Sequence, residues 1–112
     1  MVTILVKNTF EFVHCWPEAP DEVDYLRSPH RHLFAIESEI EVGHDDRELE
    51  FIMVQHSIKD FLHTPNRFAL RTSCEQIARA VGDHIAEKYG EREIIVTVYE
   101  DNENGARVHW TN

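Results

Sequence analysis

Apolar and polar residues alternate along two long segments of the chain with the period of a β-strand. Val2 to Val13 is rich in valine, isoleucine, threonine and phenylalanine, and its alternation predicts a first strand. Leu33 to Val42 places apolar residues or serine at one set of positions and mainly glutamate at the other. That pattern is typical of an antiparallel strand with one buried and one exposed face. Glu93 to Tyr99 predicts a further strand, and Asn104-Gly105 predicts a tight turn into a last strand at Ala106 to Trp110.

Between these strands, apolar residues recur with a period near 3.6 residues, which predicts two helices. The longer helix runs from Ser73 to Tyr89, with Thr72 and Glu75 as a capping box and Gly90 as its terminator. Its apolar stripe consists of Ile77, Ala80, Val81, His84 and Ile85. A shorter helix is predicted at Ser57 to His63. It ends before Pro65, because a proline cannot continue a helix.

Two segments are less regular. Cys15 to Pro29 contains three prolines and several acidic residues, so we interpret it as a loop. Glu48 to Val54 fits either a short extended segment or the beginning of the shorter helix. The predicted order is therefore ββααββ, an α+β fold with a four-stranded antiparallel sheet and two helices packed on one face. We expect a single domain covering residues 1–112.

The net negative charge of the chain argues against some classes of binding partner. It has 21 acidic and 11 basic residues and a formal net charge of -10. Such a surface argues against nucleic acid or an anionic membrane as the main partner, and an anionic substrate would need a local basic patch. Cys15 and Cys74 do not form a disulfide framework, and no secretory signal or membrane-spanning apolar stretch is visible, so we expect a cytoplasmic protein.

Three histidines suggest a metal site. His30 and His32 lie two positions apart on a predicted strand, so they project from the same face about 7 Å apart. If this strand pairs antiparallel with the first one, His14 lies across from them. Three neutral imidazoles with an open fourth position are typical of a catalytic zinc site. The alternative is surface or hydrogen-bonded histidines, because the chain has 8 histidines in 112 residues.

Four short motifs follow the order of motifs in a known family. They are Phe10 to His14 (Phe-Glu-Phe-Val-His), His30 to Phe34 (His-Arg-His-Leu-Phe), Thr72 to Ala78 (Thr-Ser-Cys-Glu-Gln-Ile-Ala) and Val98 to Glu100 (Val-Tyr-Glu). The chain thereby resembles the T-fold enzymes of the 6-pyruvoyl-tetrahydropterin synthase and 6-carboxytetrahydropterin synthase (QueD) family. The likeness runs nearly from end to end but is patchy.

This resemblance implies a T-fold and a zinc ion held by the three histidines. It implies that Glu100 binds the pterin ring, because a carboxylate can accept two parallel N–H bonds from a 2-amino-4-oxo pyrimidine. Ser73 and Glu75, at the start of the longer helix, match the family motif and are expected to contact the substrate as well. Family members close their sheets into trimers or hexamers with the pocket between subunits, so a homo-oligomer is expected.

The chain also departs from the family pattern. Where the family has a catalytic cysteine before its second and third ligands, this chain has Asp24, Tyr25 and Leu26, and the family's Asp-His pair is missing. Asp24 is therefore the candidate base, since proton transfer needs one within reach of the substrate. Cys15 is expected to point away from the metal, and Cys74 lies in a first helical turn, which favours a thiolate. Arg31 replaces a glycine and should point to the opposite strand face, toward acids of a neighbouring subunit or a phosphate.

Three functions are compatible with these observations. The first is a diverged zinc-dependent carbon–oxygen lyase acting on a dihydroneopterin-triphosphate-like compound. The second is a T-fold module that binds or sequesters a pterin, purine or modified nucleotide without catalysis. The third is a metal-free structural or interaction protein.

Overall fold

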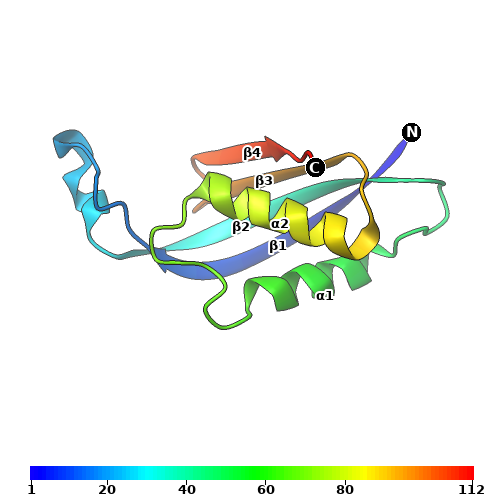
Figure 1. Ribbon diagram of the computed structural model, residues 1–112, viewed down its shortest axis with the longest axis horizontal. Helices are drawn as coiled ribbons and strands as arrows, with labels where there is room; N and C mark the ends of the chain where they lie inside the picture. Colours follow the sequence, from blue (N-terminus) through cyan, green and yellow to red (C-terminus); the bar gives the residue numbers. More distant parts are fainter.

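The computed structural model describes residues 1–112. Its elements follow in the order β1 (Val2–His14), η1 (a 3-10 helix, Asp21–Arg27), β2 (His30–Val42), α1 (Phe51–Leu62), α2 (Cys74–Tyr89), β3 (Ile94–Glu100) and β4 (Gly105–His109). The strands form one antiparallel sheet in the order β1-β2-β3-β4, and α1 and α2 lie on one face of it (Figure 1). The predicted α+β class and the order ββααββ are thus confirmed.

The long pairing between β1 and β2 positions the rest of the molecule. The register runs without a break from Val2 opposite Val42 to His14 opposite His30. This register places His14 beside His30, two of the three predicted ligands. It also agrees with the alternating patterns of the two strands. The sequence prediction that His14 lies across from the second strand is confirmed.

The core lies between the sheet and the helices. Every second residue of β2 from Phe34 onward points to this side, and Phe34 and Ile40 have no exposed surface. α1 packs on β1, and α2 packs on β3 and β4. The buried residues of α2 are Cys74, Ile77, Ala78, Val81, Gly82, Ile85 and Ala86, spaced as one face of a helix. Ala80 and His84, predicted for this stripe, lie half-buried at its border.

The shorter helix begins earlier than predicted. The Glu50 carboxylate accepts hydrogen bonds from the backbone N–H groups of Ile52 and Met53 and so caps the first turn of α1. The first turn has no apolar face toward the core, because Phe51 to Met53 are all exposed. This lack of periodicity explains why Glu48 to Val54 was ambiguous in the sequence.

The capping box of α2 lies one residue later than predicted. Ser73 Oγ accepts from the Gln76 N–H at 3.2 Å, and the Gln76 side chain accepts from the Ser73 N–H at 2.9 Å. Ser73 is the residue directly before α2, so Thr72 lies one position too early for the box, and its hydroxyl donates to the Ala69 carbonyl at 2.6 Å. The prediction of Thr72 and Glu75 as the box was therefore wrong, although the type of cap was right.

The turn between β3 and β4 also differs from the prediction. Asp101 and Asn102 have positive φ angles of 52° and 58°, and these residues reverse the chain. Asn104-Gly105 does not form the turn, and Gly105 is the first residue of β4. A side chain at Gly105 would approach the Val98 carbonyl oxygen within 2.1 Å, so glycine is required there for close strand contact.

The segment predicted as a loop contains η1. Figure 1 shows it, coloured from blue to cyan, projecting beyond the end of the sheet at which β1 stops and β2 starts. Its backbone is irregular at Val23, with φ -129° and ψ 38°, and no residue of η1 is buried. No helix of the structure has the length and apolar character needed to cross a lipid bilayer.

Candidate metal centre

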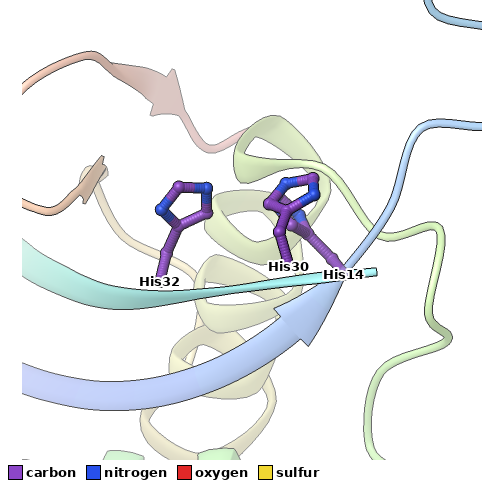
Figure 2. A group of neighbouring side chains, drawn as sticks. All are labelled: His14, His30 and His32. Carbon is purple, nitrogen blue, oxygen red and sulfur yellow. The ribbon is translucent and has the colours of Figure 1, made fainter. Parts of the chain in front are cut away.

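His14, His30 and His32 meet at the end of the sheet. One ring nitrogen from each lies within 4.8 Å of the other two. Figure 2 shows the three imidazoles rising from the same side of β1 and β2 and gathering above them. His14 is only 8% exposed, and the other two are half-buried. The structure therefore confirms that the predicted ligands come close enough together to hold one metal ion.

The second nitrogen of each ring already has a partner. Each Nδ1 faces an oxygen that can only accept a hydrogen bond, so each neutral ring carries its proton on Nδ1. The contacts are His14 to Thr72 O at 2.9 Å, His30 to Ser28 O at 2.8 Å and His32 to Asp101 Oδ2 at 2.5 Å. This tautomer leaves the lone pair of every Nε2 free for a metal, and partners of this kind orient the ligands of known metal sites.

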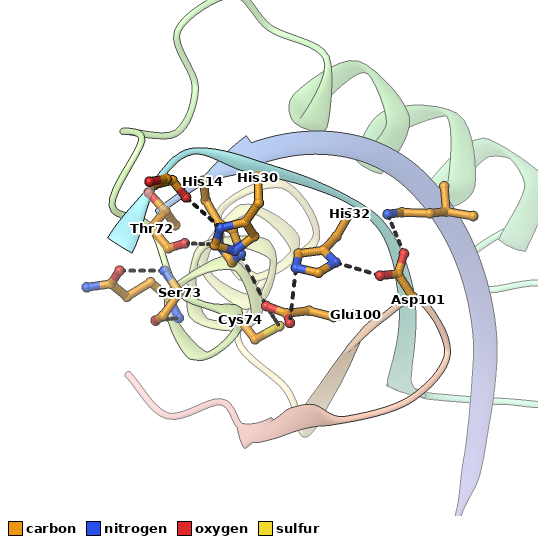
Figure 3. Close-up of polar contacts among 11 residues, drawn as sticks. His14, His30, His32, Thr72, Ser73, Cys74, Glu100 and Asp101 are labelled. Carbon is orange, nitrogen blue, oxygen red and sulfur yellow. Dashed lines mark hydrogen bonds and ion pairs between the residues drawn. The ribbon is translucent and has the colours of Figure 1, made fainter. Parts of the chain in front are cut away.

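Asp101 contacts the candidate ligand His32, and the sequence analysis missed it. Its Oδ2 accepts from His32 Nδ1, and its Oδ1 accepts from the Leu33 backbone N–H at 2.9 Å (Figure 3). The Asp101 N–H in turn donates to the Leu33 carbonyl at 2.8 Å. The hydrogen bonds from His32 and Leu33 hold the pKa of Asp101 below its usual value, so its carboxyl group is ionised.

The carboxylate of Glu100 faces the free nitrogens. Its Oε1 is 3.4 Å from His14 Nε2, and its Oε2 is 3.7 Å from His32 Nε2. His32 Nε2 is buried and has no hydrogen-bond partner. Because neutral Nε2 atoms present lone pairs, a carboxylate beside them adds negative charge to a group of acceptors. This donor set is complementary to a cation, and imidazole ligands suit zinc, copper, iron and nickel.

A cavity of about 460 Å³ adjoins His14 and His30. It is lined by His14 and His30, by Ser73, Cys74 and Glu75 at the start of α2, and by Glu100. The three residues predicted to contact a substrate therefore share one cavity. Asp24, the predicted base, is exposed on η1 and is not among the residues that line this cavity, although its neighbour Leu26 is.

The two cysteines both border the cavity. The pKa of Cys74 is raised to about 12 by burial and by the carboxylate of Glu100, to which its Sγ donates at 3.7 Å. The helix start was expected to favour a thiolate, but burial and the nearby carboxylate keep the thiol neutral. Cys15 follows the last residue of β1, where strand alternation no longer determines its direction.

Arginines supply local positive charge on a chain that is acidic overall. Arg71 lines the cavity and also a second, adjoining one of about 680 Å³, which Arg67 lines as well. Arg71 forms an ion pair with Glu18. Arg31 forms an ion pair with Glu11 of the same chain at 2.8 Å, so it already has an acidic partner on the neighbouring strand. Arg71 is therefore the arginine on the wall of the cavity beside the histidines, and Arg67 lies on the wall of the second cavity only.

The comparisons with known proteins do not assign the chain to a family. Neither a scan against protein-family models nor a search of curated protein sequences gave a match. The functional argument therefore rests on the chemistry of the site: three imidazoles whose ligand nitrogens lie within 4.8 Å of one another, the hydrogen bonds that orient the rings, and the carboxylates on the cavity wall.

Proposed function

We propose that this chain is a zinc-binding T-fold protein of the pterin-synthase type, acting as a diverged carbon–oxygen lyase on a dihydroneopterin-triphosphate-like compound. The observation that supports this most is the orientation of His14, His30 and His32. All three Nδ1 atoms are occupied by acceptors, so all three Nε2 atoms are available to one metal ion. Three histidines are the protein ligands of a known class of catalytic zinc site.

Each residue of the site has a role in this proposal. Zinc, when bound, would polarise the side-chain hydroxyls of a dihydropterin and lower their pKa. Glu100 would accept paired N–H bonds from the heterocycle, and Ser73 and Glu75 would line its binding cavity. Arg71, on the wall of the same cavity, supplies positive charge for an anionic part of the substrate.

Asp24 is the proposed base. It lies on η1, at the end of the sheet that carries the histidines, and its carboxylate is exposed to solvent. A homo-oligomer, trimeric or hexameric, is proposed with the pocket between subunits. The free edge of β1, 13 residues long, supports this, because unpaired strand edges of that length are normally covered. Light scattering that shows a monomer at micromolar concentration would contradict the oligomer. The two free cysteines fit a reducing cytoplasm.

Metal content is the first test. Wild-type protein should purify with one zinc ion per chain by elemental analysis, and the double variant His30→Ala, His32→Ala should contain none. The matched control is His44→Ala, His109→Ala, which removes two histidines outside the site and should keep its zinc. Wild-type protein that takes up no zinc would favour the metal-free structural or interaction role instead.

Turnover is the second test. Zinc-loaded protein is incubated with dihydroneopterin triphosphate, and the products are separated by chromatography. A new pterin product that requires zinc, and that is lost in Asp24→Asn, would support the lyase and its base. Absence of any product from zinc-loaded protein would remove this reaction.

A second candidate function is a binding module without catalysis. The neutral thiol of Cys74, with a pKa of about 12, and the position of Asp24 outside the cavity favour it, because neither group is placed as a base beside the metal. Such a module would bind a pterin, purine or modified nucleotide tightly and leave it unchanged. Isothermal calorimetry with a pterin, together with the turnover test, separates it from the lyase.

A further inference from the structure

We propose that Glu100 is a fourth ligand of the metal ion, in addition to its proposed role toward a heterocycle. The inference rests on the metal-binding part of the proposed function, and it assigns the position that a three-histidine site would otherwise leave to water. It follows from the placement of the carboxylate and from the hydrogen bonds that fix the three rings.

The distances fit a shared ion. Donor atoms bound to zinc at about 2.0–2.2 Å in a tetrahedral arrangement lie about 3.3–3.6 Å from one another. Glu100 Oε1 is 3.4 Å from His14 Nε2, and Oε2 is 3.7 Å from His32 Nε2. Figure 3 shows the carboxylate below the rings, directed toward both of them. The distance to His14 therefore has the spacing of two ligands of one ion, and the distance to His32 is slightly longer.

A hydrogen bond from a neutral ring does not account for this placement. The Nδ1 protons of His14 and His32 are directed to Thr72 O and Asp101 Oδ2, so the neutral rings have no N–H left for Glu100. Lone pairs would otherwise face lone pairs at the buried His32 Nε2, which lacks a partner. A cation between them removes this repulsion and satisfies both groups.

The backbone holds Glu100 in place. It is the last residue of β3 and pairs with Phe34 of β2, two residues from His32 on the same strand face. Its N–H donates to the Asn104 carbonyl at 2.8 Å, and Cys74 Sγ donates to its Oε1. A side chain anchored by a strand and by a neighbouring helix is pre-organised for ligation.

This assignment has a consequence for the proposed substrate. A carboxylate bound to the metal cannot at the same time offer both oxygens to a pair of N–H groups on a heterocycle. Binding of a pterin at Glu100 would therefore require the carboxylate to leave the metal, which opens the fourth position for the substrate hydroxyl only when the substrate is present.

Zinc affinity measured by chelator competition on the full chain tests the inference. Glu100→Gln removes the charge, whereas Glu100→Asp keeps the charge but withdraws the oxygens by one methylene. Loss of an outer partner of a ligand already weakens metal binding about 10–100-fold, so both variants should lose more than about tenfold. The control is Glu75→Gln, which alters a carboxylate of the same cavity that forms no ion pair with a histidine and should bind zinc like the wild type.

The outcomes separate ligation from a field effect. Wild-type affinity in Glu100→Asp, with a loss only in Glu100→Gln, would assign a remote charge effect and overturn the proposal. Wild-type affinity in both variants would overturn it as well. Circular dichroism and the melting temperature of the zinc-free variants exclude misfolding as the cause of a loss.

A cobalt-substituted sample provides a second readout. Thiocyanate should change the visible spectrum of Co²⁺ in Glu100→Gln at a lower concentration than in the wild type, because water is displaced more easily than a tethered carboxylate. Equal responses would count against ligation. If both variants lose zinc affinity and the wild type shows no turnover, the result supports Glu100 as the fourth ligand and contradicts the lyase. If turnover occurs and both variants bind zinc like the wild type, the result supports the lyase and contradicts Glu100 as a ligand.

Discussion

The inward face of β2 has two regions that differ in chemistry although they share one alternation. From Phe34 to Val42 the inward residues are apolar apart from Ser38, and the helices cover them. At His30 and His32 the same face continues with two imidazoles, and His30 lines a cavity. The strand thus places core residues and the candidate metal ligands on one face with the same alternation.

Phe34 marks the border between the two regions. Its ring has no exposed surface and lies 5.4 Å from the His14 ring and 6.0 Å from the His32 ring, measured between centroids. The packed core therefore supports the site directly, since a ring that cannot shift also restricts the imidazoles beside it. Replacements on either side of this border show how far the two regions depend on each other.

The largest expected effect is on the covered side. Phe34→Ala should lower the free energy of unfolding by about 3–5 kcal/mol, because it leaves a cavity among the rings of Phe10, Phe12 and the histidines. Urea denaturation of the zinc-free protein measures this loss. Phe34→Leu is the control and should cost less than about 1.5 kcal/mol. A loss below about 1 kcal/mol in the alanine variant would contradict a packed border.

The next effect belongs to the uncovered side. Asp101→Asn should weaken zinc binding about 10–100-fold, because the amide is a poorer acceptor for His32 Nδ1 and holds the ring less firmly. Chelator competition measures the affinity. Glu103→Gln, in the same turn, should bind zinc like the wild type. Equal affinity in Asp101→Asn and the wild type would show that the hydrogen bond does not support the ligand.

A smaller effect tests how α2 is seated on the covered side. A methyl group at Gly82 would lie 2.7 Å from Trp110 Cδ1, so Gly82→Ala should destabilise the protein by about 1–3 kcal/mol. Helix propensity alone predicts that the free energy of unfolding rises by about 1 kcal/mol. Thermal melting distinguishes the two, and in a Trp110→Ala background the same substitution should become stabilising. Stabilisation in the wild-type background would contradict the close contact.

The smallest effect concerns the histidine of the covered region. Burial, followed by the charges of Lys88 and Arg67, lowers the pKa of His84 below its usual value. The unfolded chain then binds the proton more readily, so this contribution to stability is complete above pH about 6.5 and is lost as the pH falls. In zinc-free protein, His84→Gln should show a shallower decline of stability between pH 7 and 5. An unchanged decline would contradict the assignment.

The sequence predicts the strands and the ligands well because both depend on a short period. Alternation in β1 and β2 requires His14, His30 and His32 to share a face, and the register follows from burying the apolar side. The start of α1 was left open between an extended segment and a helix, because Phe51 to Met53 are apolar but exposed and hide the helical period. Local patterns are informative where burial is regular.

The supporting residues of the site could not be predicted in the same way. Asp101 reaches His32 only because it adopts a positive φ angle in a turn that the sequence indicated at Asn104-Gly105. Thr72 faces His14 through its backbone carbonyl, a group that every residue has. Such contacts depend on the path of the chain and leave no residue-specific signal.

Asp101 contacts two adjacent residues of β2 through both carboxylate oxygens and its own N–H. The terminal hairpin is thereby fastened to the long strands beside the metal position. Metal binding would consequently stabilise the attachment of the β3–β4 hairpin to the long strands. The backbone amides near Leu33 and Asp101 would then exchange with solvent more slowly, and the hairpin would resist proteolysis better.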